Sequence, residues 1–330
     1  MKHIRRDVVL SVSTLLLLLL CAFLSLRFGS THLSGAAFFG GLLRRAGFEG
    51  ATLILWKIRL PRMLAGIFAG AGLATSGTLL QRATDNPLAA PNVLGINAGA
   101  GFFVILCLSL FPTQVALLPF AAFFGAMLTA LGILAISRKM GLDKLTVMLC
   151  GVAFSALFGA GISFFSVLDA DVLASYTDFS VGGLQGVTLR ELYLPIPIIL
   201  LCIAGAWMIS RHLQLFCLGD SLAGALGVSV KRVRLTALIL AAACAAAAVS
   251  FAGLLGFVGL LVPHICRKLA RGNVRCELLL APMAGGILLL AADLAGRLIF
   301  TPTEVPVGIF TALLGVPFFL VLLIRRNRHA

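Results

Sequence analysis

Charged residues are scarce in this sequence. Only 12% of its 330 residues are Asp, Glu, Lys or Arg, whereas a soluble domain carries about 25%. Hydrophobic residues make up 60% of the chain, against about 45–50% in a soluble domain. At about 20 apolar residues per membrane-spanning helix, this content is enough for roughly ten spans. The composition therefore excludes an ordinary soluble fold and predicts an all-α polytopic membrane protein surrounded by membrane lipid.

Motifs for catalysis, metal binding or nucleotide binding are also missing. The eight cysteines form no CxxC pair and have no metal-ligand spacing, so we expect small buried hydrophobic side chains and no metal. The chain contains no GxxxxGK[ST] loop, no HExxH motif and no catalytic triad. We therefore expect no enzymatic activity and no cofactor, and any ATP must be bound by a partner subunit.

The net charge of +14 does not by itself indicate a nucleic-acid partner. Such binding requires a basic face on a soluble fold, whereas the Lys and Arg residues here occupy short gaps between apolar runs. We expect no nucleic acid and interpret these residues as signals of membrane topology. The apolar run from Val8 to Leu26 is longer than the roughly 7–15 residues of a signal peptide, so we interpret it as the first span.

Charged, Gly-rich and Pro-rich gaps divide the chain into ten predicted spans. The eighth is short and rich in Gly and Pro, so neighbouring helices would have to support it. No linker or internal repeat marks a second domain, and residues 1–330 are expected to form a single transmembrane domain. The predicted spans are 8–28, 60–82, 93–110, 115–136, 145–168, 192–210, 232–251, 256–270, 277–299 and 305–324.

The distribution of basic residues predicts the orientation. If both termini are cytoplasmic, most of the 26 Lys and Arg residues fall on the cytoplasmic side, as the positive-inside rule requires. The predicted external loop from Arg44 to Arg62 is the exception. Small residues indicate close helix packing, since GIFAG (66–70) and GINAG (95–99) both have GxxxG spacing.

Two segments have informative local patterns. In 218–230, Leu218, Leu222 and Leu226 recur at helical spacing, which fits either a short amphipathic helix that docks a partner or a connector lying on the surface. Gly219 and Gly227 would bracket this helix, with Asp220 as a cap. In the ninth span, Asp293 and Arg297 are four residues apart and are expected to form an ion pair.

Six motifs give the chain a specific resemblance. Together they resemble the permease family of ATP-binding-cassette (ABC) importers for iron-siderophores, haem and vitamin B12, whose fold is the type II importer permease. The motifs occur in the family's order and cover nearly the whole chain. They are RLPR (59–62), GLATSGTLLQRATDNPLAAPNVLGINAGA (72–100), LGDSLAGALGVSV (218–230), GFVGLLVPHICR (256–267), LAADLAGRL (290–298) and PTEVPVGIFTALLGVPFFLVLL (302–323).

The resemblance implies partners and a mechanism. A homodimer or pair of permeases would enclose a central path in the bacterial inner membrane, with a cytoplasmic ABC ATPase below and a periplasmic substrate-binding protein above. Transport would proceed by alternating access, and the fifth and tenth spans would line the pore. The alternative from another class is an ion-coupled secondary transporter, which needs carboxylates at mid-membrane depth.

The resemblance also assigns functions to individual residues. Asn86 and Leu88 would help to close a cytoplasmic gate, and Tyr176, Thr177 and Phe179 would line the periplasmic mouth of the pore. Arg59, Arg62 and Arg297 are expected at the periplasmic surface, either docking the binding protein or acting as interfacial anchors. Coupling to the ATPase is assigned to Leu218, Gly219, Asp220, Leu222, Ala225, Leu226 and Gly227.

Overall fold

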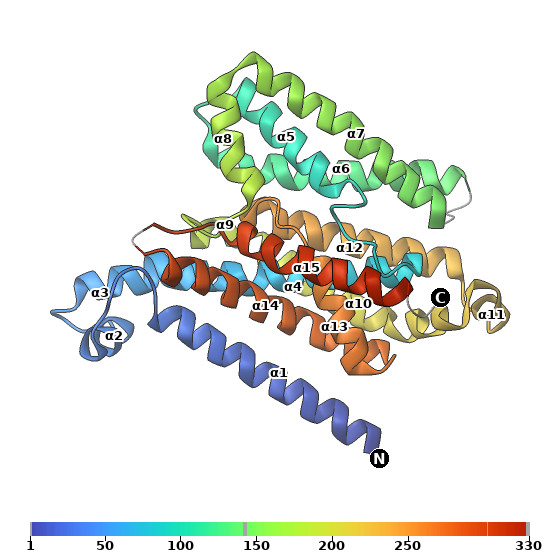
Figure 1. Ribbon diagram of the computed structural model, residues 1–330, viewed down its shortest axis with the longest axis horizontal. Coiled ribbons are helices and arrows are strands. Elements are labelled where there is room, and N and C mark those ends of the chain that lie inside the picture. The colour runs from blue at the N-terminus through green and yellow to red at the C-terminus, as the bar shows by residue number, and fades with distance from the viewer. Residues whose placement is uncertain (1, 141–143, 302, 328–330) are drawn as a thin grey trace.

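The computed structural model describes residues 2–140, 144–301 and 303–327, and side chains within 5–140, 144–301 and 303–320. These residues form helices and connections without a strand (Figure 1). The predicted all-α class is therefore confirmed. Pro302 in the last motif and the C-terminal residues 328–330 lie outside the described residues.

Ten helices are long. They are α1 (Lys2–Arg27), α4 (Leu60–Thr84), α5 (Ile96–Leu110), α6 (Leu118–Lys139), α7 (Lys144–Leu168), α10 (Pro195–Leu215), α12 (Val230–Ala252), α13 (Val258–Ala270), α14 (Val274–Ile299) and α15 (Val307–Asn327). Shorter elements connect them, namely α2 (Gly35–Leu42), α3 (Glu49–Leu53), the π-helical η1 (Ile54–Arg59), η2 (Val115–Leu117), α8 (Ala170–Val181), α9 (Leu189–Leu192), η3 (Phe216–Leu218) and α11 (Asp220–Ala225).

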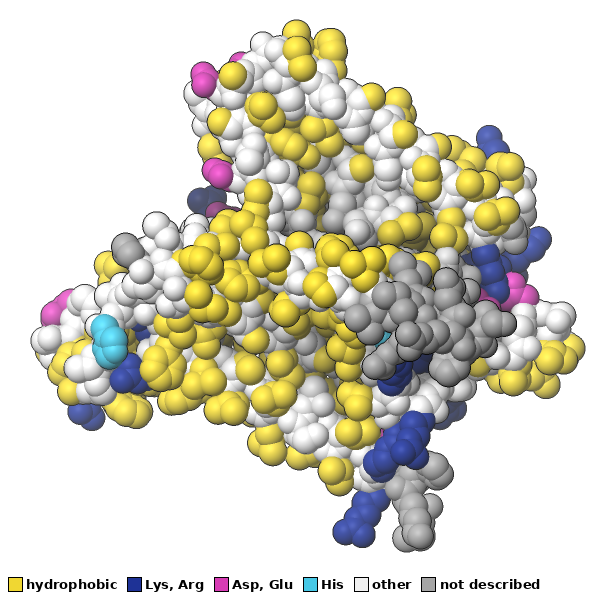
Figure 2. Space-filling view, viewed as in Figure 1, with side chains coloured by type: hydrophobic (Ala, Val, Ile, Leu, Met, Phe, Trp, Pro, Cys, Tyr) yellow, Lys and Arg dark blue, Asp and Glu magenta, His cyan; other side chains and the backbone are white. Residues whose placement is uncertain are grey.

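Each predicted span overlaps one of the long helices. Within the part of the chain that is described, seven helical stretches are long and apolar enough to cross a membrane. Helices α5 and α15 offer shorter apolar stretches, and α13 has only 13 residues. Hydrophobic side chains also cover much of the face seen in Figure 2, as contact with lipid requires, so the membrane-protein class is supported. The count of ten spans stays a prediction. The seven stretches are Arg5–Arg27, Glu49–Thr84, Val115–Lys139, Lys144–Leu168, Leu189–Leu218, Val230–Ala252 and Val274–Ile299.

The prediction of a loop from Arg44 to Arg62 is wrong from Glu49 onward. There α3, η1 and α4 run on without a break. Ala51 and Leu55, four residues apart, are buried in a small apolar cluster with Phe38 of α2. This packing stabilises a helix in a segment that its charges alone made look like a loop.

Helix α4 is the centre of the fold, since 21 of its 25 residues are buried. It packs against α14, α12 and α13 through glycines. A Cβ atom at Gly70 would overlap the backbone of Gly285 on α14, and one at Gly77 would overlap Gly259 on α13. The close packing expected from the small residues is therefore present, because only glycine permits these backbone contacts.

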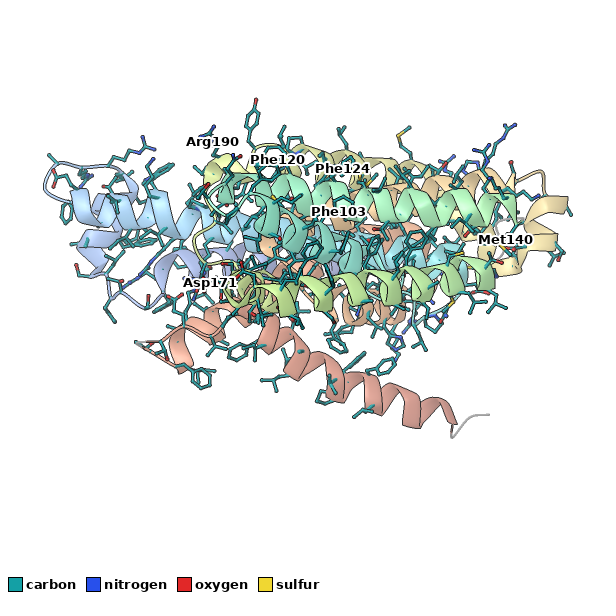
Figure 3. All side chains as sticks on the ribbon, turned by 90° about the horizontal axis from the view of Figure 1, so that it is seen from above. Phe103, Phe120, Phe124, Met140, Asp171 and Arg190 are labelled. Atoms are coloured by element: carbon teal, nitrogen blue, oxygen red, sulfur yellow. The ribbon has the colours of Figure 1, made fainter. Side chains whose placement is uncertain are left out.

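Helices α5 to α8 form a second layer beside α4 and α12, seen in green at the top of Figure 1. Phenylalanines fill this layer, with the Phe103 ring 5.9 Å from Phe124. Viewed from above, Asp171 and Arg190 lie towards one end of the bundle and Met140 lies at the other (Figure 3). Polar sites of the chain can thus be assigned to two opposite ends, here called the Arg190 end and the Met140 end.

Replacing Gly70 with Ala should destabilise the protein. The added methyl group would force α4 away from α14, and overpacking of this kind costs about 1–3 kcal/mol of unfolding free energy. The midpoint of thermal unfolding in detergent measures the loss. Gly50→Ala is the matched control, because no atom lies within 4 Å of the added Cβ. Equal midpoints for the two variants would contradict this account of the packing.

Candidate functional site

The segment 218–230 lies at the Met140 end and contains a short helix. Gly219 (φ 91°) precedes α11 and Gly227 (φ 84°) follows it, so the predicted glycine brackets are present. Leu222 and Leu226 are 57% and 62% exposed, and Leu218 is 53% exposed. Helix α11 therefore offers an apolar surface of the kind that a partner protein covers.

Asp220 does not cap α11 as expected. No side chain caps this helix, and the Asp220 carboxylate instead pairs with Arg234 of α12 at 2.6 Å. The same guanidinium donates from Nε to the carbonyl oxygen of Ala83 at 2.9 Å. Arg234 thereby links α11 to the last turn of α4, because a cation satisfies carbonyl groups that have no partner within the helix.

A buried ion cluster lies beside this connection and was not predicted. Arg82 of α4 pairs with Glu277 of α14, whose side chain is fully buried. The Nε atom of Arg82 donates to the Glu277 carboxylate at 3.0 Å. Arg267 of α13 lies 3.6 Å from the other carboxylate oxygen. The Sγ atom of Cys217 accepts from Arg82 at 3.0 Å. The sequence shows only an isolated acid at the start of the ninth span, and nothing in it identifies partners from α4 and α13.

The predicted cytoplasmic gate residues lie in an irregular connection between α4 and α5. Asp85 has a left-handed backbone (φ 51°) that ends α4, and Asn86 follows it. The Oδ1 atom of Asn86 accepts from the backbone N–H of Leu88 at 2.9 Å, and both residues are half-buried. This bond shapes the loop locally. The gating role of the pair stays a prediction.

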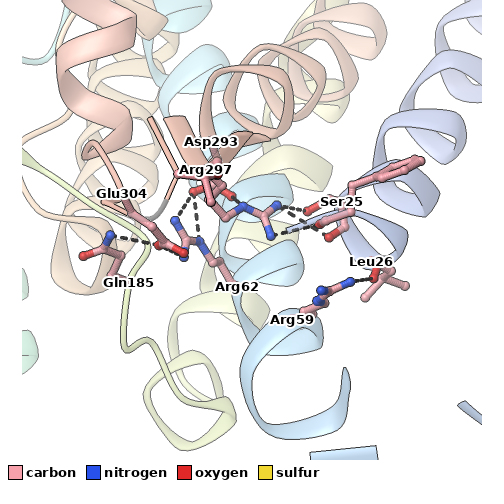
Figure 4. Close-up of polar contacts among 10 residues, drawn as sticks. Ser25, Leu26, Arg59, Arg62, Gln185, Asp293, Arg297 and Glu304 are labelled. Atoms are coloured by element: carbon pink, nitrogen blue, oxygen red, sulfur yellow. Dashed lines mark hydrogen bonds and ion pairs between the residues drawn. The ribbon is translucent and has the colours of Figure 1, made fainter. Parts of the chain in front are cut away.

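A second buried ion cluster lies at the Arg190 end (Figure 4). Arg62 of α4 contacts Asp293 of α14 at 2.8 Å and Glu304, in the connection before α15, at 2.6 Å. Gln185 donates to the same Glu304 oxygen at 3.0 Å. Asp293 also pairs with Arg297 at 3.0 Å, as its spacing predicted. One arginine thus holds together three segments that are far apart in the sequence.

Glu304 is the member of this cluster that lies in a connection between helices. Its burial acts to raise the pKa of the carboxyl group, but the hydrogen bond and charge of Arg62 outweigh this and hold the pKa below its ordinary value. A carboxyl group with a depressed pKa stabilises the fold above its unfolded pKa. That contribution is lost as the pH falls through the folded pKa.

The other two arginines of the predicted docking surface fasten the end of α1. Arg59 donates to the carbonyl oxygens of Leu26 at 2.8 Å and Arg27 at 2.9 Å. Arg297 donates to the Ser25 hydroxyl at 2.9 Å. These groups lie in the last turn of α1, where carbonyls lack helical partners and the helix dipole favours a cation.

The expected surface position of Arg59, Arg62 and Arg297 is therefore wrong. The three residues are only 3%, 8% and 3% exposed. The positive-inside rule places a charge along the membrane normal and says nothing about whether it faces solvent or protein. Here the partners lie within the chain. A role of these arginines in docking a binding protein stays a prediction.

The residues predicted for the pore mouth lie on α8, which is a short helix as expected. They face in different directions. Tyr176 is buried with its hydroxyl group against Gly101 of α5, Thr177 is exposed, and the carbonyl oxygen of Phe179 accepts from the backbone of Leu254 at 3.1 Å. Of the three side chains, only that of Thr177 is exposed, and its hydroxyl donates to the carbonyl oxygen of Leu173 at 2.8 Å.

Comparisons with known proteins agree with this arrangement. The chain matches the FecCD transport family over residues 17–325. It is 37% identical to the Fe(3+)-citrate import system permease protein YfmE of Bacillus subtilis, covering 93% of this chain and 92% of that one. It is 38% identical to the cobalamin import system permease protein BtuC of Halobacterium salinarum, covering 86% and 76%.

A solved structure has the same fold. It is an inward-facing metal-chelate type ABC transporter, with a TM-score of 0.85 and 28% identity, covering 96% of this chain and 98% of that chain.

Charge reversal of Arg62 should destabilise the whole protein. Arg62→Glu leaves the buried Asp293 and the half-buried Glu304 beside a third carboxylate, and breaking a buried pair costs about 3–5 kcal/mol. We expect a lower thermal midpoint and a lower membrane yield. Arg45→Glu makes the same charge change at an exposed position of the same end and serves as control. A normal midpoint combined with slower association of a binding protein would restore Arg62 to a docking role.

Proposed function

The chain belongs to the FecCD transport family and is the permease subunit of an ABC importer, and from that premise we propose how it transports its substrate. The substrate is an iron-siderophore, haem or cobalamin-like molecule, which crosses the inner membrane by alternating access. The curated relatives carry both ferric citrate and cobalamin in their names, so this range remains open. Selection among these substrates is assigned to a periplasmic binding protein.

The observation that carries the proposal is the exposed apolar face of α11. A cytoplasmic ABC ATPase covers Leu218, Leu222 and Leu226 and supplies the energy, since the sequence has no nucleotide-binding loop. Movement of α11 reaches the core through Asp220 and Arg234, because Arg234 also holds the last turn of α4. The chemistry of ATP stays on the partner, and this chain needs no cofactor.

A second permease copy completes the translocation path. Only two of the 25 residues of α7, Val147 and Gly151, are buried within one chain. Large apolar residues on α15 are exposed as well, with Leu313 at 64% and Leu314 at 52%. These two helices are the fifth and tenth predicted spans. Their exposed faces suit the wall of a path shared between two copies.

In the proposed orientation, ten spans form one domain from residue 1 to 330 and both termini are cytoplasmic. The Met140 end, with α11, then faces the cytoplasm, and the Arg190 end faces the periplasm. The binding protein docks at the Arg190 end. Arg59, Arg62 and Arg297 serve this contact indirectly, by fixing the end of α1 and the connection before α15.

An ion-coupled secondary transporter is less well supported. Such a protein needs carboxylates that bind and release a cation. Asp293 and Glu277, the two fully buried acids of the described spans, are both held by arginines. Uptake that survives ATP depletion but stops when the proton gradient is collapsed would favour this alternative.

Charged substitutions on α11 should uncouple transport. We expect Leu222→Glu with Leu226→Glu to reduce ATP-driven uptake at least tenfold, because the central apolar contacts of an interface dominate its affinity. Co-purification of the ATPase should fall in parallel, while the thermal midpoint of the permease stays unchanged. Met140→Glu, at an exposed position of the same end, is the control. A complex that survives the double substitution would exclude α11 as the coupling helix.

Reporter fusions test the orientation. Fusions after Arg138, Arg211 and Arg271 should report a cytoplasmic position. Arg138 lies in the last turn of α6, Arg211 lies near the end of α10, and Arg271 directly follows α13, all at the Met140 end. A fusion at Glu49 should report the periplasm. The opposite result at Glu49 would reverse the topology while leaving the fold unchanged.

A further inference from the structure

A cleft at the Met140 end opens between the end of α10 and the connection from α13 to α14. Its volume is about 520 Å³. We propose that this cleft binds the phosphate headgroup of an anionic phospholipid in the cytoplasmic leaflet. The proposal uses the orientation proposed above and goes beyond transport. The lining residues are Arg211, Gln214, Arg271, Gly272, Asn273 and Arg275.

Charge is the first argument. Three arginines line the cleft and no acidic residue does. Throughout the described chain, none of the three forms an ion pair with a carboxylate, whereas Arg62, Arg82, Arg234, Arg267 and Arg297 all do. The Nε atom of Arg275 is buried and has no hydrogen-bond acceptor. A phosphate group supplies the acceptors and the negative charge that these arginines lack.

The cleft is held in shape by side chains that bind the backbone. Gln214 donates to the carbonyl oxygen of Gly272 at 3.0 Å and accepts from the N–H of Val274 at 2.7 Å. Asn273 caps α14 by accepting from the N–H of Arg275 at 3.1 Å, and its amide donates to Asp7 of α1 at 2.8 Å. Arg271 in the connection and Arg275 in the first turn of α14 are therefore held in place beside the same cleft that Arg211 lines.

The surface beside the cleft fits a lipid better than a free anion. Along α10, Leu200, Ala204, Trp207, Arg211 and Gln214 follow one another at helical spacing, and the first four are exposed. Trp207 is 52% exposed, and the Arg275 guanidinium lies 5.8 Å from its ring centre. Tryptophan is enriched at the membrane interface, where its ring reaches the headgroup level.

Helix α14 repeats this order of side chains. Leu279, 45% exposed, lies one turn beyond Arg275. Since α10 and α14 are in contact, two helices each offer a basic residue at the cytoplasmic end and apolar residues further into the membrane. Acyl chains fit the apolar part, and the phosphate fits the basic part. Basic pockets of this kind between spans on the cytoplasmic side bind lipid headgroups.

Quenching of Trp207 fluorescence tests the site. The chain has two tryptophans, so Trp56→Phe leaves Trp207 as the only one. The full-length protein is placed in phosphatidylcholine nanodiscs that contain one lipid with brominated acyl chains. This brominated lipid is phosphatidylglycerol in one sample and phosphatidylcholine in the other. We expect stronger quenching by the phosphatidylglycerol. Arg211→Gln with Arg275→Gln should lower the apparent affinity about fivefold per arginine and remove this preference.

The control variant is Arg138→Gln with Lys139→Gln, which removes the same charge from an exposed site at the same end. It should keep the preference, and a loss equal to that of the cleft variant would overturn the proposal. Equal quenching by both lipids in the parent protein would overturn it too. If the double variant does not fold, the single Arg271→Gln substitution provides the same comparison.

Two further measurements test whether the anion comes from a lipid or from solution, and whether the ATPase covers the cleft. Inorganic phosphate that abolishes the preference, at an ionic strength where chloride does not, would assign the cleft to a soluble anion and overturn the lipid source. Loss of the preference when the ATPase binds would make the cleft a subunit interface and would also overturn the proposal. Preference retained under both conditions supports the lipid site.

Discussion

The pairing of α4 with α14 at two depths is the constraint on which the rest of the structure depends. Arg62 and Arg82 both lie on α4, and their partners Asp293 and Glu277 both lie on α14. Twenty residues of helix span about 30 Å, which is the thickness of the hydrocarbon core. The two clusters therefore lie at opposite boundaries of the membrane in the proposed orientation, and each leaves a charge without a partner if the helices slide past each other. Register is set by charge, while the glycines at 70 and 285 let the backbones meet between the clusters.

Both clusters also join the paired helices to parts of the chain that transport would move. At the Arg190 end, Glu304 links the paired helices to the start of α15, and Arg59 and Arg297 link them to the end of α1. At the Met140 end, Arg82 contacts Cys217 just before α11, and Arg234 connects α11 to the last turn of α4. In the proposed mechanism, an ATPase acting on α11 would therefore act on the central helix directly. The layer of α5 to α8 is joined to that core mainly by apolar contacts, with one ion pair, 3.4 Å long, between Lys144 of α7 and Asp85 at the end of α4.

The sequence predicted what depends on local pattern and failed where partners are distant. The lengths of the apolar runs predicted a helix in each of the ten places where a long one lies. The glycines predicted the limits of α11, and the four-residue spacing predicted the ion pair of Asp293 and Arg297. The burial of Arg62 was missed because its acids follow 231 and 242 residues later, where no periodicity connects them. Glu277 was missed for the same reason. Asp220 was assigned to a cap because that role is local, whereas its actual partner is on the next helix. The helix from Glu49 was missed because charge density obscured two apolar residues at helical spacing.

The distance in sequence between Arg62 and Asp293 has a consequence for biogenesis. A ribosome adding roughly 5–20 residues per second needs about 10–50 s to make the intervening 231 residues. During that interval α4 has already been made, yet neither of the carboxylates that pair with Arg62 in the folded protein exists. The growing chain must then keep Arg62 near the headgroups or beside the insertion machinery until α14 arrives. Arg62 and Asp293 can therefore pair only after α14 has been made, so the final packing of the central helix is a late event.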